Sequence, residues 1–313
     1  MTSSHFATIG PAIADQLAFF RELNDLKRLY AYNLGPHSYA SAVFLGATKA
    51  LHSDAPLQAD VWCASIVSAA RLGAITANVL RDIGIDKSES SVVLKNAVLV
   101  QSSLSGPLRI SLTDACEVLN QICLENVPQS PDWATRLAAS PRAGATCPGK
   151  ARIALEPAEM HSDHCAMVAT YAFLLADTFS ANREDAWLIG LCHHFHNAYL
   201  PDAGFTGEIL LGVHLNRVVN SLRLRVLNTL SERYRNRVSY LFDEINDLQS
   251  PLAQTFHAAD TIDRVLQMEH FERVAQFRVA TALEEFNLVH EGAAQEFQHA
   301  LLRSIGISCK TAA

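Results

Sequence analysis

The stretch "LIGLCHHFHNAYLPDAGF", residues 188–205, places three histidines within four positions, His193, His194 and His196. An apolar run precedes them, and a Pro-Asp pair follows shortly after. Consecutive residues on a helix point about 100° apart, so His193 and His194 can reach one point only where the helix ends. The segment "HNAYLPD" is typical of such an ending. The pattern indicates either two adjacent metal ligands or ordinary polar residues at a helix end.

Helical periodicity extends from this stretch over most of the chain. Apolar residues recur at three- and four-residue spacing on both sides of it, for example over 162–179, 216–245 and 250–268. Only "SSVVLKNAVLVQSSL" (90–104) and "LRISL" (108–112) resemble strands, and both are short. We therefore predict an all-α fold.

The composition is that of a folded globular protein. The 313 residues are 49% hydrophobic and 18% charged, which excludes a disordered chain. The net charge of −7, with both signs mixed along the sequence, gives no electrostatic argument for a nucleic acid or an acidic membrane as partner. No apolar run is long enough to span a bilayer, and the N-terminus lacks the pattern of a signal peptide. We expect a cytoplasmic protein with neither membrane nor nucleic acid as partner.

The seven cysteines are scattered, and none forms a CxxC pair. A disulfide framework or zinc knuckle is therefore not expected, and the pattern is typical of reduced thiols in a cytosol.

The stretch 138–156 collects proline, glycine and small residues, which is typical of a connector. It predicts a division into an N-terminal helical region, 1–137, and a second domain, 157–313.

The two halves resemble each other in sequence. One segment starts at His37 and the other at His161; both open with His-Ser, continue with a helix of the same length and then place an Asp-x-Trp tripeptide. Ser68 and Ala69 stand where the second segment has its histidine pair. One interpretation is that the N-terminal half is a degenerate copy that has lost its polar centre. The alternative is coincidence between two alanine-rich helical hairpins.

The second half supplies several residues of the kinds that ligate metals. A divalent metal needs three or four nitrogen or oxygen ligands, and imidazole with carboxylate suits Zn, Fe, Mn, Co or Ni. Taken singly, each of these residues could equally be a capping or solvated side chain; their order along the chain favours a site. They are His161 and His164, one turn apart at a helix start, His193 and His194, and His257 and Asp260 in "FHAAD".

This order resembles the HD-domain superfamily of metal-dependent phosphohydrolases. Its members carry a first histidine, a His-Asp doublet after an apolar helix, and a last aspartate, commonly in an Ala-Asp pair. The matching residues run from His161-Ser through "DAWLIGLCHH" to Ala259-Asp260. The loop "HHFHNAYLPDA" is similar to the "HDIGKIGIPDA" loop of HD-GYP phosphodiesterases, and "DAWLIGLCHH" to a helix of HDOD signalling domains. The resemblance covers roughly 156–270 and implies an HD-domain-like helical bundle.

The resemblance implies four metal ligands, namely His161, His193, His194 and Asp260. His194 stands where the family has its aspartate. An aspartate can bridge two metals through its two oxygens, whereas a neutral imidazole has one free lone pair and cannot. The expected cofactor is therefore one divalent transition metal (Fe, Mn, Zn, Co or Ni) rather than a metal pair. His196 occupies a slot that is normally glycine and is not expected to be a ligand.

Other polar residues extend this site. Asp202 and Glu208 are the candidate catalytic residues, as proton donors to a leaving group. Glu159 and Asp163 could orient the imidazoles. The sequence leaves open whether His164, His214 and His257 are additional metal ligands. One of Arg217, Arg223 and Arg225 could bind a phosphate, although charged residues on a long helix are more often its solvated face.

The function implied is that of a metal-dependent hydrolase acting on a phosphoester of a nucleotide or small metabolite through a metal-activated water. The partner implied is then a small phosphorylated molecule, and the sequence leaves open whether the protein forms a homo-oligomer. The HD-GYP tripeptide is absent, so hydrolysis of cyclic dinucleotides is not implied. One alternative is an HD-fold iron-dependent oxygenase, which needs further histidines between the doublet and Asp260. Another is a non-catalytic, HDOD-like signalling or scaffold protein with a decayed doublet.

Overall fold

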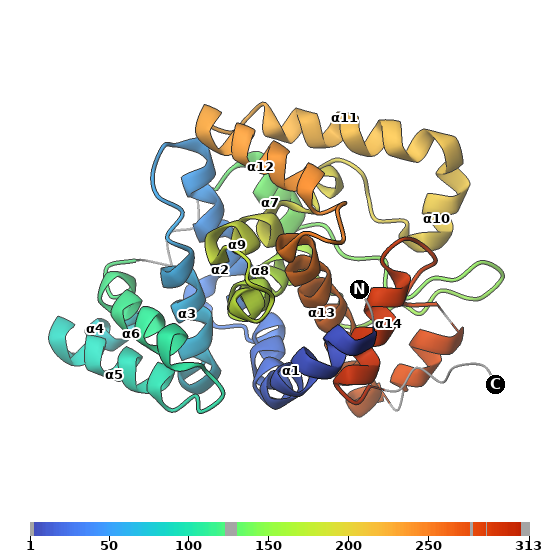
Figure 1. Ribbon diagram of the computed structural model, residues 1–313. Helices are drawn as coiled ribbons and strands as arrows, with labels where there is room; N and C mark the ends of the chain where they lie inside the picture. Colours follow the sequence, from blue (N-terminus) through green and yellow to red (C-terminus); the bar gives the residue numbers. More distant parts are fainter. Residues whose placement is uncertain (1–2, 123–129, 276–277, 286, 308–313) are drawn as a thin grey trace.

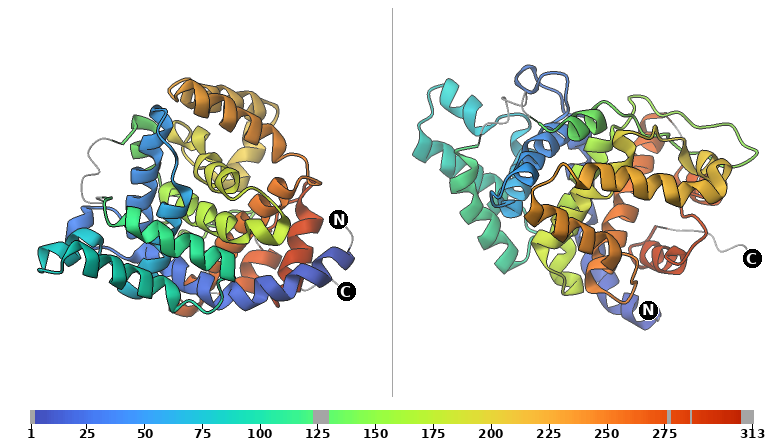
Figure 2. Two further views of the ribbon diagram at one scale, coloured as in Figure 1. Left: turned by 60° about the vertical axis from the view of Figure 1, so that its left-hand side comes forward. Right: turned by 90° about the horizontal axis from the view of Figure 1, so that it is seen from above.

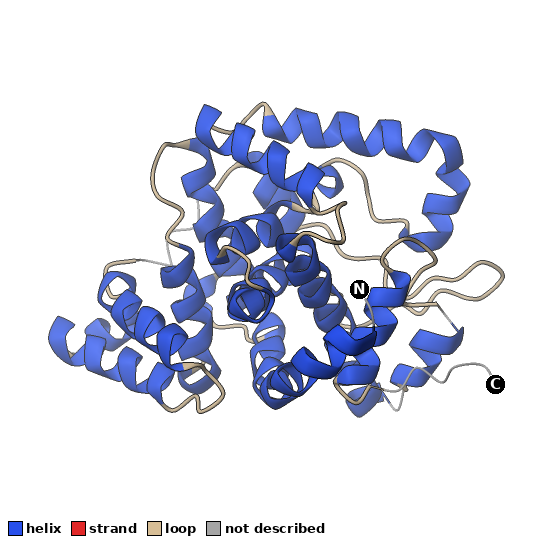
Figure 3. Ribbon diagram, viewed as in Figure 1, coloured by secondary structure: helices blue, strands red, loops and turns tan. Residues whose placement is uncertain are grey.

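The computed structural model describes residues 3–122, 130–275, 278–285 and 287–307, and all regular elements within these ranges are helices (Figure 3). β-contacts among the described residues are limited to three isolated bridges, one of which pairs Ala145 with Ile153. The predicted all-α fold is confirmed.

The two segments that resemble strands, 90–104 and 108–112, do not form strands. They lie mostly in α5 (Lys87–Leu99) and α6 (Gly106–Leu119). A capping box starts α5 ahead of its valines: the Asp86 side chain accepts a hydrogen bond from the Glu89 N–H at 2.9 Å, and the Glu89 side chain accepts one from the Asp86 N–H at 3.1 Å. Packing of α5 and α6 on each other and on α3 (Ala59–Leu72) then favours the helix over the β-propensity of the valines.

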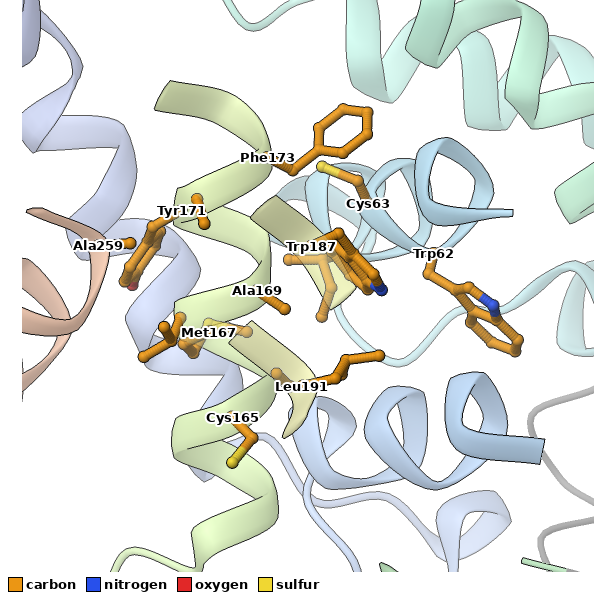
Figure 4. Close-up of a cluster of buried hydrophobic side chains, with 14 of the residues drawn as sticks. Trp62, Cys63, Cys165, Met167, Ala169, Tyr171, Phe173, Trp187, Leu191 and Ala259 are labelled. Atoms are coloured by element: carbon orange, nitrogen blue, oxygen red, sulfur yellow. The ribbon is translucent and has the colours of Figure 1, made fainter. Parts of the chain in front are cut away.

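One buried helix, α8 (His161–Phe179), forms the centre of the molecule (Figure 1). It packs on α9 (Arg183–Cys192), α13 (Pro251–Ala275) and α2 (Tyr39–Thr48). Figure 4 shows side chains of α8, such as Tyr171 and Phe173, in one apolar cluster with Trp187 of α9. Because apolar side chains surround α8 along most of its length, the polar residues of its first turns are held in fixed positions.

The contact between α8 and α9 is unusually close at Gly190. A Cβ atom at this position would lie 2.4 Å from the Cα atom of Ala169, so only glycine allows the two backbones to approach so closely. Two residues later α9 ends at Cys192, and His193 is its C-cap. A 3₁₀ turn, η4 (Phe195–Ala198), follows. The predicted end of the helix at the histidine pair is thus confirmed.

The N-terminal half encloses α8 from the other side. The helices α1 (Ser3–Asn24) and α7 (Asp132–Ala138) contact α8, as do α2 and α3. Three short 3₁₀ helices connect this part, η1 (Asp25–Arg28), η2 (Tyr32–Leu34) and η3 (Lys49–His52). The helices α4 (Ala77–Asp82), α5 and α6 project from α3 as a side lobe (Figure 2). One hydrophobic cluster runs from Ile9 to Ile305, so both halves share a core; the internal repeat stays a prediction.

The C-terminal elements cover the remaining sides. The helices α10 (Gly204–Leu211), α11 (Leu215–Leu227) and α12 (Glu232–Glu244) cross one end of the bundle, with η5 (Gly212–His214) between the first two (Figure 1). After α13 come a π-helical turn, η6 (Thr281–Glu285), and α14 (Gln295–Ser304), which packs back on α1.

Two observations bear on the expected environment of the chain. Within the described ranges, no helix combines the length and the apolar character needed to cross a membrane. Five cysteines are buried and free of disulfides, and Cys123 and Cys309 lie outside the described residues.

Candidate metal centre

Four histidines from two helices converge at one end of α8. His161 and His164 lie in its first turns, and His193 and His194 come from the end of α9. The ring centroid of His164 lies 5.0 Å from the centroids of His193 and of His194. The ring centroid of His161 also lies 5.0 Å from that of His194. His164, His193 and His194 each offer one ring nitrogen as a possible metal ligand, and these three nitrogens all lie within 4.8 Å of one another.

Each of these imidazoles contacts, through Nδ1, an oxygen that can only accept a hydrogen bond. A neutral imidazole has a single N–H, so Nδ1 carries the proton and Nε2 keeps its lone pair. Ligating histidines are held in this tautomer by such partners. The pairs are His161 with the Ser140 carbonyl (2.9 Å), His164 with the Asp263 carboxylate (2.7 Å), His193 with the Gly190 carbonyl (2.8 Å) and His194 with the Asn197 side-chain oxygen (2.7 Å).

The second ring nitrogens of His164 and His193 face each other. The Nε2 atoms of His164 and His193 lie 3.1 Å apart, and in the tautomers above both carry lone pairs. The Nε2 atom of His161 is buried and has no hydrogen-bond partner among the described residues. Lone pairs buried at this spacing repel each other unless a cation lies between them. This donor set therefore fits a divalent metal.

Asp260 on α13 adds a carboxylate to the group. One of its oxygens lies 3.3 Å from Nε2 of His164, and the other lies 3.6 Å from the Arg264 guanidinium. Burial favours the protonated acid, but the positive charge of the neighbouring Arg264 opposes it, and the pKa of Asp260 lies well below its usual range. Asp260 is thus ionised at neutral pH and available as an anionic ligand.

Burial keeps three of these imidazoles neutral, those of His161, His193 and His194. It lowers the pKa of His161 to about 4, with the charge of Arg142 acting in the same direction. Burial, followed by the neighbouring imidazoles, likewise lowers the pKa values of His193 and His194 well below the ordinary value. A metal binds the neutral ring, so at pH 7 these residues are in the state that binding requires.

A cavity of about 460 Å³ opens beside this group, a size suited to a small metabolite. His193, His194 and Asp260 line it, whereas His161 and His164 are fully buried behind them. Three arginines line the same cavity, Arg142, Arg223 and Arg264, together with apolar side chains such as Phe205, Phe256 and Met268.

The predicted catalytic residues both line this cavity and differ in character. Asp202 accepts hydrogen bonds from the N–H groups of Ala143 (2.9 Å) and Gly204 (2.8 Å) and lies 3.8 Å from Nε2 of His161. Although burial opposes it, the charge of Arg142 and these N–H groups lower the pKa of Asp202. Desolvation, followed by the charge of Asp202, instead raises the pKa of Glu208. Asp202 is therefore a fixed anion, and Glu208 is the better proton donor.

The other residues considered from the sequence separate into two groups. Lining the cavity are His196, His257 and Arg223; the ring of His257 donates through Nε2 to the Ile245 carbonyl at 3.0 Å. Away from it are the exposed His214, Arg217 and Arg225, the last of which lies over the ring of Tyr199.

Asp163 does not orient any of the four imidazoles. Its carboxylate accepts hydrogen bonds from the Ser38 hydroxyl and from the Met160 N–H, and so caps the start of α8. The carboxylate that orients an imidazole is that of Asp263, which was not predicted from the sequence. Asp263 lies three residues after Asp260, on the same helix face, and this i, i+3 spacing could have indicated it.

The predicted connector contributes directly to the site. Residues 139–160 contain no helix, and their backbone folds over the cavity: the Arg142 N–H donates to the Glu159 carbonyl at 2.8 Å, and Ala145 pairs with Ile153. This fold brings Arg142, Ala145 and Thr146 to the cavity wall.

A comparison with protein families matches residues 139–301 to a model described as HD domain, which is more than half of the chain. The chain belongs to the HD-domain family. Searches of curated proteins and of solved structures find no match. Members of the HD-domain family generally bind divalent metals, and the cluster of His164, His193 and His194 could hold such an ion. Residues 1–138 lie outside the matched HD domain.

Proposed function

We propose that the protein is a metal-dependent hydrolase of the HD type that cleaves a phosphoester of a nucleotide or similar small metabolite. One observation carries the proposal: the imidazoles of His193 and His194, each held through Nδ1 by an oxygen acceptor, border a cavity that three guanidinium groups also line. The first feature suits a transition metal, and the second suits a phosphate group.

The ligand set proposed is the one expected from the sequence, His161, His193, His194 and Asp260, with His164 added because of its position. A bound divalent ion supplies an acidified water and polarises a phosphoryl oxygen. With imidazole at His194 in place of a bridging carboxylate, this set supports a single Fe, Mn, Zn, Co or Ni ion.

The cationic side chains around the cavity would bind and orient the substrate. Nη1 of Arg142 is buried and has no hydrogen-bond partner within the described ranges, so it is free to donate to an anion. Arg264 lies within 3.6 Å of Asp260, close to the proposed ligands. A phosphate beside these groups would be held at the metal, while the apolar wall near Phe256 and Met268 excludes water from the rest of the substrate.

The experiment that tests the proposal combines elemental analysis with a substrate screen. We expect about one transition metal per purified chain, and phosphate release from a panel of nucleotides and sugar phosphates that a chelator abolishes and metal restores. A folded protein without metal would contradict the proposal and favour the scaffold alternative. Stoichiometric iron with oxygen consumption and no phosphate release would favour the oxygenase. Of the histidines between the doublet and Asp260 that an oxygenase would need, His214 is exposed and away from the cavity, whereas His196 and His257 line it.

Glu208 is proposed to protonate the leaving group. The variant Glu208→Gln keeps the size and hydrogen-bonding capacity of the side chain but has no acidic proton. Because general acid catalysis contributes about 10²- to 10⁴-fold, we expect kcat to fall by at least about 10²-fold with metal content unchanged. Steady-state kinetics on the best substrate checks this. Glu232→Gln, an exposed change on α12, is the control, and an unchanged kcat in Glu208→Gln would assign the proton to another donor.

A further inference from the structure

Lys27, a residue of the N-terminal half, carries a buried ammonium group next to the metal centre. It lies in η1, and its side chain is only 2% exposed. Its Nζ atom lies 2.5 Å from a carboxylate oxygen of Glu159 and 2.6 Å from one of Asp263. Lysine is rarely buried unless it is paired, and here two carboxylates pair it.

The contact with Asp263 continues to a histidine of the centre. The second oxygen of Asp263 accepts the hydrogen bond from Nδ1 of His164 at 2.7 Å, and both side chains are completely buried. A continuous chain of polar contacts therefore runs from Lys27 through Asp263 to His164. A carboxylate behind a ligating imidazole fixes the orientation of the ring, and here the position of that carboxylate is itself fixed by the ammonium group.

Charge balance gives Lys27 a second role. Glu159 also lies 3.7 Å from the Arg142 guanidinium, so two buried carboxylates face two cations. Glu159, His164 and Asp263 together offer ligand atoms within 4.8 Å of one another, a grouping that could hold a metal ion. The Nζ atom of Lys27 already contacts both of these carboxylates. The place that a cation could take between Glu159 and Asp263 is therefore already filled by the side-chain ammonium group of Lys27.

We propose that Lys27 is a positioning residue of the metal centre: through Asp263 it holds His164 with Nε2 towards His193, and it takes the place of a second metal ion. The N-terminal half then completes a site whose other residues lie within the matched HD domain. This inference rests on the proposed function only in taking His164 as a metal ligand.

The test compares Co²⁺ binding to metal-free wild type and to the variant Lys27→Met, which keeps the chain length and removes the charge. Because outer partners of ligating histidines contribute about 10- to 100-fold to metal affinity, we expect Kd to rise on the order of tenfold. The variant Lys27→Arg, which restores the cation, should recover most of the affinity. Lys95→Met removes a lysine from a surface ion pair with Glu117 and should leave Kd unchanged.

A second readout needs neither metal nor activity. Nitrogen-15 NMR reports which ring nitrogen of His164 carries the proton, and we expect Nδ1–H in the wild type and a tautomer mixture in Lys27→Met. If Lys27→Met does not fold, the double variant Lys27→Met/Glu159→Gln removes one charge of each sign and tests the same point.

Two outcomes separate this inference from the proposed function. A folded Lys27→Met protein with wild-type Kd and an unchanged His164 tautomer would overturn the role of Lys27. A wild type that binds no Co²⁺, with a tautomer change in the variant, would contradict the proposed function and leave the role of Lys27 intact.

Discussion

Replacing His193 with alanine is expected to remove the bound transition metal and to lower the rate of phosphoester hydrolysis on the order of 10³-fold. A catalytic metal contributes several kcal/mol to transition-state stabilisation, and each 1.4 kcal/mol is about tenfold in rate, so loss of the ion has an effect of this size. The measurement is metal content by elemental analysis, together with kcat/KM on the best substrate.

The surroundings of His193 explain why the site should be sensitive to this change. Its Nδ1 atom is tied to the Gly190 carbonyl, so the ring has one orientation, and in that orientation Nε2 lies 3.1 Å from Nε2 of His164. The ring also packs against Phe256, with the centroids 5.1 Å apart. Alanine removes both the nitrogen and this contact.

Two further variants make the result specific. His214→Ala removes an exposed histidine outside the cavity and should keep metal and rate unchanged. His194→Asp replaces one kind of ligand by another and should retain metal, because a carboxylate also binds divalent ions. A His193→Ala protein that keeps full metal content would contradict the ligand set proposed for this site.

The part of the site that the sequence could predict depends on short-range patterns. Adjacent histidines at the end of an apolar helix, with a turn directly after them, indicate two side chains that can converge, and α9 does end at Cys192. The all-α fold follows from apolar spacing in the same way. The order of His161, the doublet and Asp260 added a family resemblance, to which the HD-domain match now corresponds.

The parts that could not be predicted depend on contacts between distant segments. Lys27 and Glu159 are 132 positions apart, and a lysine in an amphipathic N-terminal segment gives no sign that it is buried. Arg142 lies among glycines and prolines that indicate a connector, yet the same residues let the backbone fold over the cavity. Local propensity was also misleading in α5, where valines suggested a strand while the capping box and the packing on α3 and α6 determined a helix.

Gly190→Ala is expected to destabilise the protein by forcing apart the α8–α9 contact. The added methyl group would lie 2.4 Å from Cα and 2.6 Å from N of Ala169, both backbone atoms that no change of rotamer can move. The two helices must therefore separate, and with them the apolar cluster around Trp187 (Figure 4). Because the clash is with backbone atoms, the overpacking cost lies at the upper end of its usual range, about 3 kcal/mol, and alanine regains about 1 kcal/mol of this in helix propensity. We expect the free energy of unfolding to fall by about 2 kcal/mol.

The same substitution should also weaken metal binding, because the Gly190 carbonyl is the acceptor that fixes His193. Urea unfolding measures the stability, and Co²⁺ titration of the folded variant measures the affinity. Gly106→Ala is the matched control: the position lies at the start of α6 with no atom within 4 Å of the added methyl group, so the free energy of unfolding should stay within about 0.5 kcal/mol of the wild type. Equal stability of Gly190→Ala and Gly106→Ala would mean that the two helices are not in close contact at Ala169.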